Sequence, residues 1–242
     1  MKAEVRQPVE KISVGIACTR FTPNGMEILL VKKRYTYAFN KFVNGRYRSD
    51  NRTELLTLFD EMTAEEKLDI LSLNFTQIWY RIWLNNSQKM SSFYAAKSKF
   101  ENAFVADGGA KLRALISRSK KNGSLIWEIP KGRKKSRIES DMQCGLREFT
   151  EETSVTKKQI KIFPDSAQYS YISDGVKYTF IYYYALAKGN INPTVSIANK
   201  TQIGEIVEIK WMNMNALKQV DTEGRLVPYV RRIFNFMKRN AR

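Results

Sequence analysis

Three acidic side chains occupy neighbouring positions in the stretch GLREFTEETSV, residues 145–155. If this stretch is helical, Glu148, Glu151 and Glu152 are three and four residues apart and share one face. Their mutual repulsion falls when a divalent cation lies between them, and hard oxygen ligands prefer Mg²⁺ or Mn²⁺. Such a face is also common on solvated helices, with Arg147 and nearby lysines as ion-pair partners, and the spacing alone favours that ordinary interpretation.

The remaining composition limits which chemistry the chain can perform. It contains no histidine, which excludes Ser-His-Asp and Cys-His catalysis and every metal site that needs imidazole. Its two cysteines, Cys18 and Cys144, are too few for a disulfide scaffold or an all-cysteine zinc site, and they indicate a reducing intracellular compartment. Catalysis would therefore depend on carboxylates, lysines, hydroxyl groups and any metal that they bind.

The charge of the chain indicates a polyanionic partner. The 242 residues include 41 Lys and Arg against 24 Asp and Glu, which gives a formal net charge of +17. A surface of this kind binds nucleic acid by default, although a basic protein without such a partner remains the alternative. No apolar run reaches the length of a membrane span, so no membrane association is expected.

The N-terminal part of the chain predicts a β-hairpin. The β-rich runs 12–21 and 27–33 flank Thr22-Pro23-Asn24-Gly25, and Asn-Gly between two strands is a strong hairpin signal. From residue 53 to about 116 the period becomes helical, and Thr63 with Glu66 resembles a capping box at the start of a helix in this region. The apolar positions of one long helix are Leu68, Leu71, Phe75, Ile78, Trp79 and Ile82, and those of a second are Phe93, Ala96, Phe100 and Phe104.

After residue 123 the pattern returns to mixed strands and helices. The acidic stretch lies in a predicted helix over 140–153, and a second amphipathic helix closes the chain at 228–238. The predicted strands are 168–172, 177–187 and 205–212. We therefore expect an α+β protein in which a helical block interrupts one domain.

A longer motif surrounds the three glutamates, GRKKSRIESDMQCGLREFTEETSV, from Gly132 to Val155. It resembles the signature of the Nudix hydrolase superfamily: Gly, five residues, Glu, seven residues, Arg-Glu, an aliphatic residue, any residue, Glu-Glu, any residue, Gly and an aliphatic residue. Glu139 and the following RE-FT-EE match in register. Two positions depart from the signature, because one extra residue separates Gly132 from Glu139, and Ser154 replaces the glycine that usually ends the helix. The preceding WEIPKG, 127–132, is similar to the strand and turn that lead into this motif.

The resemblance implies the Nudix fold, a mixed β-sheet between helices, here with an inserted all-helical domain. The Nudix domain would comprise 1–35 and 121–242, with the Nudix box at 132–155, and the insertion would span 36–120. The implied reaction is hydrolysis of a nucleoside diphosphate linked to another group, by attack of water on a phosphorus of the pyrophosphate bridge.

The resemblance also implies roles for individual residues. Arg147 would orient a glutamate, Glu139 in this sequence, by ion pairing, and Glu151 would serve in catalysis as well as in metal binding. The implied ligands of Mg²⁺ or Mn²⁺ are Glu148, Glu151, Glu152 and the backbone carbonyl of Gly132.

A base must accept a proton from the attacking water. The segment GEIVEIKWMNM, 204–214, resembles a part of the cellular mRNA-decapping Nudix enzymes in which a glutamate lies six residues before a tryptophan, and Glu205 and Trp211 have this spacing. Glu205 is therefore the candidate base or additional metal ligand, with Glu208 in reserve. The alternative is that both glutamates are charges on an edge strand.

The layout of the whole chain resembles the decapping Nudix enzymes of large cytoplasmic DNA viruses, of the asfarvirus and poxvirus type. The segments that carry this likeness are LFDEMTAEEKLDIL, IWYRIWLN, WEIPKGR and CGLREFTEET. The resemblance implies a viral protein that removes the cap of mRNA in the host cytoplasm, releases 7-methylguanosine diphosphate and 5′-monophosphate RNA, and binds RNA through the helical insertion.

Two other functions stay open from the sequence. The first is hydrolysis of diphosphoinositol polyphosphates or nucleotide pyrophosphates, because enzymes of the asfarvirus type are known to act on the former. The second is a catalytically dead RNA-binding protein with a Nudix fold. The sequence leaves the oligomeric state open, a homodimer included.

The RNA-binding residues expected next to the predicted metal helix are basic. They could contact an RNA backbone or a long phosphate chain, or they could form an ordinary solvated loop. They are Lys131, Arg133, Lys134, Lys135 and Arg137.

No residue is assigned to stacking on a methylated guanine, which would need aromatic rings. Trp79 lies on the apolar helix face and is expected in the core, whereas Tyr80 and Trp83 are undecided. Tyr182, Tyr183 and Tyr184 would alternate between the two faces of a strand.

Overall fold

The computed structural model describes residues 9–84, 90–173, 175–221 and 224–241. The chain divides into two compact units. The first contains 1–32, 127–196 and 206–242, and the second contains 33–126 and 197–205. The second unit thus includes 197–205, which lies within the predicted Nudix segment 121–242. The boundaries of the predicted insertion, 36–120, stay a prediction.

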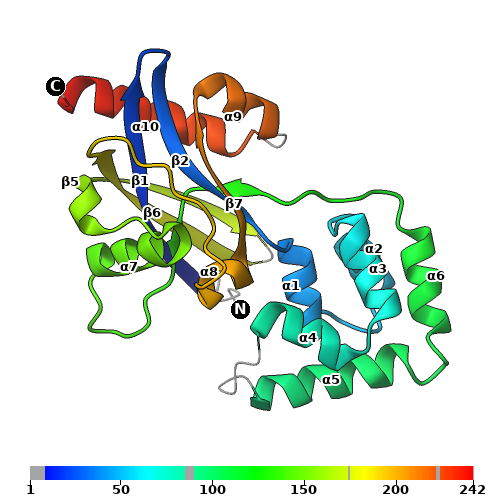
Figure 1. Cartoon of the computed structure of the whole chain (residues 1–242). Coiled ribbons are helices and arrows are strands. Elements are labelled where there is room, and N and C mark those ends of the chain that lie inside the picture. Colours follow the sequence, from blue (N-terminus) through cyan, green and yellow to red (C-terminus); the bar gives the residue numbers. More distant parts are fainter. Residues whose placement is uncertain (1–8, 85–89, 174, 222–223, 242) are drawn as a thin grey trace, which may run out of the picture. The chain divides into compact units, whose positions relative to one another are not determined.

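The first unit is built on a mixed sheet (Figure 1). Strand β1 pairs in parallel with β6, whereas the β1–β2, β1–β4, β2–β3 and β5–β6 pairs are antiparallel. The strand order is β3-β2-β1-β6-β5, with β4 also on β1 and β7 also on β2. The strands are β1 (Val9–Thr22), β2 (Gly25–Lys33), β3 (Trp127–Glu128), β4 (Lys131–Gly132), β5 (Ile160–Ser173), β6 (Val176–Ala187) and β7 (Ile206–Met212).

Helices cover both faces of this sheet. Successive side chains of a strand point to opposite faces, so neighbouring residues of β1 show which helix covers each face. On β1, Ile16 and Cys18 belong to the core cluster that contains Phe149 of helix α7 (Asp141–Thr153). Ala17 between them belongs to the cluster of helix α10 (Leu226–Asn240). The short helices α9 (Met214–Val220) and η2 (Lys157–Gln159) complete this unit.

Small residues let α7 lie close to β1. A side-chain carbon on Gly145 would be 3.3 Å from the carbonyl oxygen of Gly15 and 3.3 Å from Val14 Cγ1. A side-chain carbon on Gly15 would collide with the carbonyl oxygen of Pro130. These glycines therefore hold α7, β1 and the turn before β4 within contact of one another.

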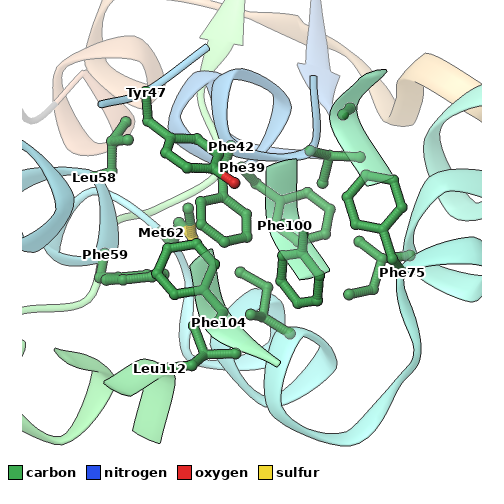
Figure 2. Packing of buried hydrophobic residues seen from close by; sticks show 14 of the residues in the cluster. Phe39, Phe42, Tyr47, Leu58, Phe59, Met62, Phe75, Phe100, Phe104 and Leu112 are labelled. Atoms are coloured by element: carbon green, nitrogen blue, oxygen red, sulfur yellow. The ribbon is translucent and has the colours of Figure 1, made fainter. Parts of the chain in front are cut away.

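The second unit is helical and has its own core, shown in Figure 2. Phe42 stacks on Tyr47 and contacts Phe59, Phe100 and Phe104, with ring centroids 5.0–6.0 Å apart. The helices are α1 (Tyr37–Val43), α2 (Arg52–Asp60), α3 (Ala64–Ser72), α4 (Phe75–Trp83), α5 (Met90–Phe104), α6 (Ala110–Arg118) and α8 (Lys200–Glu205).

The expected long helix through Leu68 and Ile82 is wrong, because the chain forms two helices there. Leu73 has extended backbone angles, and Asn74 starts α4 with a second capping box to Gln77. Two positions of the predicted apolar face also lie outside the core, since Leu68 is 63% exposed and Leu71 is 42% exposed.

Other expectations for this unit are confirmed. Thr63 and Glu66 form the predicted capping box, and the four apolar positions of the second predicted helix are buried in α5. Within the described chain, no helix combines the length and the apolar character that crossing a bilayer requires.

Candidate active site

The predicted acidic helix is α7, and both of its ends are fixed by local interactions. At its start, Ser140 accepts a hydrogen bond from the backbone N–H of Gln143, whose side chain accepts one from the Ser140 N–H. At its end, Ser154 has φ 59° and ψ 7°, the left-handed conformation that glycine adopts most easily. Ser154 thus takes the conformation required of the missing glycine, and its N–H still donates to Thr150.

Two of the three glutamates of α7 lie against β4. Glu152 is 3% exposed, and its Oε2 accepts a hydrogen bond of 3.1 Å from the backbone N–H of Lys131. The carboxylate of Glu148 lies directly over the Cα atom of Gly132, in the space that a side-chain carbon would occupy. The motif needs glycine at position 132, because any side chain there would overlap the carboxylate of Glu148.

Arg147 forms ion pairs with three carboxylates of the motif. Its Nε donates to Glu139 Oε1 at 2.7 Å and its Nη2 to Glu139 Oε2 at 3.2 Å, a two-point contact. Its Nη1 donates to Glu148 Oε1 at 2.6 Å and to Glu151 Oε2 at 3.2 Å. Nη2 also donates to the carbonyl of Arg133, which attaches the loop before α7 to the same guanidinium.

These contacts shift the pKa of both partners in the pair. The hydrogen bond from Arg147, and a weaker one from the backbone N–H of Lys135, lower the pKa of the Glu139 carboxyl to about 2. The pKa of Arg147 rises, chiefly because of its hydrogen bond to Glu139. Arg147 therefore stays charged, and Glu139 is ionised at any pH at which the protein is expected to work.

The donor set suits a divalent cation. Carboxylate oxygens of Glu148 and Glu151 both lie within 3.2 Å of one Arg147 nitrogen, so positive charge already occupies the place where they converge. Hard oxygen donors of this kind prefer Mg²⁺ and Mn²⁺. In the described part of the chain no three acidic or cysteine side chains are yet arranged around a common metal position. Metal binding would therefore require Glu148 and Glu151 to turn from Arg147, which keeps its two-point contact with Glu139.

The predicted RNA-binding residues have different surroundings. Lys134 pairs with Asp141 at 2.6 Å, which raises the pKa of the lysine, and Lys135 pairs with Glu151 at 2.8 Å. Arg133 and Arg137 are exposed. The loop thus brings Lys135 against Glu151, and its role in RNA binding stays a prediction.

Lys131 forms a contact that sequence reasoning missed. Its Nζ lies 2.5 Å from Glu128 Oε2, and both side chains are more than 90% buried. The same nitrogen lies 5.4 Å from the ring centre of Phe180. Both residues stand in the quoted WEIPKG segment, but their three-residue spacing across a turn gives no sign of a buried ion pair.

Cys144 is a second residue whose place was not foreseen. It lies between Arg147 and Gly132, with Sγ 3.6 Å from Arg147 Nη2 and 3.7 Å from the Gly132 carbonyl oxygen. Burial raises the pKa of its thiol to about 11, so it remains protonated.

The candidate base, Glu205, belongs to the second unit. It is the last residue of α8 and precedes β7, so its expected place at the start of the strand is off by one residue. Its carboxylate is 55% exposed and lies 3.3 Å from Lys33 Nζ, and its carbonyl accepts from the N–H of Arg34. Glu208 is exposed on β7, as expected for an edge-strand charge. Their catalytic roles stay predictions.

The aromatic candidates are now placed within their own units. Trp79 is fully buried in the helical core, as expected. Tyr182 and Tyr184 pack with the α10 cluster, whereas Tyr183 lies with the α7 cluster. The predicted alternation is therefore confirmed, and Tyr183 is the member on the side of the acidic helix.

Several known proteins are similar to this chain. The NUDIX domain family matches residues 102–232. The mRNA-decapping protein g5R of African swine fever virus (isolate Pig/Kenya/KEN-50/1950) is 35% identical, over 96% of this chain and 98% of that protein. A putative mRNA-decapping protein of Acanthamoeba polyphaga mimivirus is 25% identical over 85% of this chain and 62% of its own length. A solved C. elegans Ap4A hydrolase binary complex is similar with a TM-score of 0.49, at 14% identity, over 94% of this chain and 97% of that one. The chain belongs to the Nudix family.

Proposed function

We propose that this chain is a Nudix pyrophosphohydrolase that removes the 5′ cap of mRNA and releases 7-methylguanosine diphosphate and 5′-monophosphate RNA. One observation carries the proposal: the intact glutamate cluster of the Nudix box occurs in a chain that is 35% identical, along nearly its whole length, to a protein named mRNA-decapping protein. The alignment covers 96% of this chain and 98% of that relative, so it extends over the helical unit as well as the Nudix box. Whole-length likeness therefore supports the same class of substrate.

Nudix hydrolases generally use divalent metal ions, and we propose Mg²⁺ or Mn²⁺ here. The carboxylates of Glu148, Glu151 and Glu152 and the carbonyl of Gly132 would hold the ion. When bound, it supplies screening of phosphate charge, activation of water and stabilisation of the leaving group. Glu152 is already fixed by the Lys131 N–H, so it provides the most constrained of these ligands.

The protein's own side chains would then orient the catalytic groups and deprotonate the attacking water. Arg147 holds Glu139 by two hydrogen bonds and keeps the loop carbonyl of Arg133 in place, so it would orient Glu139 and the loop before α7 without itself reacting. Glu205 would accept the proton of the attacking water, because its carboxylate is exposed to solvent.

The RNA strand would be attracted by the basic surface. With a net charge of +17 and exposed Arg133 and Arg137 beside the carboxylates, phosphate contacts would displace counterions. We therefore propose that binding to uncapped RNA weakens steeply as salt rises from low to physiological concentration. A cytoplasmic place of action would follow from a capped mRNA substrate.

The test uses RNA labelled in the cap phosphates, incubated with the full chain and Mn²⁺. Wild type is expected to release labelled 7-methylguanosine diphosphate, and Glu151→Gln is expected to lose at least about 100-fold in rate. Glu101→Gln is the matched control, because Glu101 is a helical glutamate of the other unit, half exposed and paired with Lys97. Equal rates for wild type and Glu151→Gln would contradict the assignment of the site.

A second substrate class is separated by the same assay. The cations near the cluster, Lys134 and Lys135 among them, would also suit a compact polyanion such as a diphosphoinositol polyphosphate. Turnover of that compound without release from capped RNA would overturn decapping and favour the alternative. RNA binding without turnover of either compound would indicate a protein that has lost catalysis.

A further inference from the structure

A row of aromatic rings crosses strands β5 and β6 in the first unit. The rings of Tyr171 and Tyr178 stack with centroids 5.3 Å apart, and Tyr171 and Phe180 lie 5.8 Å apart. Phe180 in turn stacks with Tyr182 at 6.4 Å. Tyr178, Phe180 and Tyr182 are two residues apart on β6, and Tyr171 is the direct cross-strand partner of Tyr178. All four therefore point to one face of the sheet.

Only one end of this row belongs to the hydrophobic core. Tyr182 is 3% exposed and packs in the α10 cluster, and Phe180 is partly buried against that cluster. Tyr171 is 43% exposed, and neither it nor Tyr178 belongs to any core cluster of the described chain. Rings needed only to fill the core would be covered, so the outer end of the row requires another explanation.

A positive charge accompanies the outer end of the row. Lys11 Nζ lies 5.5 Å from the ring centre of Tyr178, its neighbour in register on β1. Lys131 Nζ lies 5.4 Å from the ring centre of Phe180, but its side chain is buried in the ion pair with Glu128. Aromatic faces flanked by cations are the combination that binds single-stranded nucleic acid, because bases stack on the rings while phosphates meet the cations.

The row lies on the α10 face of the sheet, and β4 connects it to the carboxylates of α7 on the other face. Lys131, which contacts Phe180 through its side chain, donates its backbone N–H to Glu152. The next residue, Gly132, lies against the carboxylate of Glu148. One strand of two residues therefore joins the aromatic row to the candidate metal ligands, all within the first unit.

We propose that the three outer rings of the row, Tyr171, Tyr178 and Phe180, form a stacking platform for bases of the RNA strand that follows the cleaved pyrophosphate. This inference rests on the proposed function for its choice of RNA as the polymer. The bases of the RNA body occupy the row, and Lys11 meets the phosphate backbone beside it. Stacking of this kind tolerates any sequence, because every base presents a flat aromatic face.

The test measures binding without catalysis or a cap. The full chain, without divalent ions, is titrated into two fluorescent, uncapped oligoribonucleotides of about ten nucleotides. One is intact, and the other has abasic riboses at every position, so both carry the same phosphates. Wild type is expected to bind the intact strand about 10-fold to 100-fold more tightly, as base stacking predicts.

Variants then assign that preference to the row. Tyr171→Leu and Phe180→Leu should each reduce the preference for the intact strand about 5-fold or more, with little change for the abasic strand. Tyr171→Phe, which keeps the ring, should bind as wild type does. Phe21→Leu is the matched control, because Phe21 is an exposed aromatic of the same sheet, on β1, and lies outside the row.

Two results would overturn the inference. The first is equal affinity of wild type for intact and abasic strands, a comparison that needs no variant and so does not depend on how the variants fold. The second is a Tyr171→Leu protein that loses binding to 7-methylguanosine diphosphate while its preference for intact RNA is unchanged, which would assign the row to the cap base. A wild type that prefers intact strands but releases no cap would refute the proposed function and leave the platform standing.

Discussion

The guanidinium of Arg147 and the carboxylate of Glu139 meet through two hydrogen bonds, Nε to Oε1 at 2.7 Å and Nη2 to Oε2 at 3.2 Å. The pair joins the loop before α7 to the helix itself, eight residues away in sequence. Because a planar fork fixes both partners in orientation as well as in distance, Nη1 is left pointing at Glu148 and Glu151. One side chain thus contacts three carboxylates of the Nudix box.

The pair makes stability depend on pH in a defined window. The folded pKa of Glu139 is about 2, below its ordinary value of 4.5, so the interaction stabilises the fold fully above about 4.5. That contribution is lost as the pH falls from 4.5 towards 2, because the unfolded chain then binds the proton more readily. The free energy of unfolding of Glu139→Gln, measured with urea, should therefore decrease less than that of wild type as the pH is lowered through this window. Parallel curves for the two proteins would refute the coupling.

Ser154 offers a test of backbone strain at the end of α7. A serine in the left-handed conformation costs about 1–2 kcal/mol, whereas glycine adopts it freely but loses more entropy on folding. Ser154→Gly should therefore raise the free energy of unfolding by about 0.5–1 kcal/mol, measured by urea unfolding. Ser154→Ala keeps the strain and should give no such gain. A destabilised Ser154→Gly protein would mean that the exposed hydroxyl contributes more than the strain costs.

Gly132 tests how closely the site is packed. A side-chain carbon at this position would overlap the carboxylate of Glu148, so Gly132→Ala must displace that carboxylate. Decapping activity should fall by about 10-fold to 100-fold, the usual effect of misplacing the support of a metal ligand. The circular dichroism spectrum should stay that of wild type, because β4 is a two-residue strand at the site. Unchanged activity would show that Glu148 has no fixed role.

The sequence predicted the parts of this structure that depend on local signals. The hairpin formed as expected, with Thr22 paired to Gly25, because its turn residues and strand propensities agree. The motif placed Glu139 and Arg147 together, and the structure shows their contact. Ser140 was placed at the start of the acidic helix, and it caps α7.

Other features were missed. The apolar period through Leu68 and Leu71 predicted one helix, but the cap at Asn74 interrupts it, and no local rule weighs a cap against a continuous period. The role expected of Lys131 at the RNA stays a prediction, but the ion pair of its ammonium with the buried carboxylate of Glu128, three residues earlier, was not foreseen. Glu205 was expected on a strand and instead ends a helix.

The most direct test of the central claim is the position of a metal ion. Crystals of the full chain soaked in Mn²⁺ would be measured at the manganese absorption edge, where anomalous scattering locates the ion. The account predicts an anomalous peak about 2.0–2.6 Å from carboxylate oxygens of Glu148, Glu151 or Glu152, with Arg147 still held by Glu139. A peak elsewhere, with these three carboxylates free of metal, would contradict it.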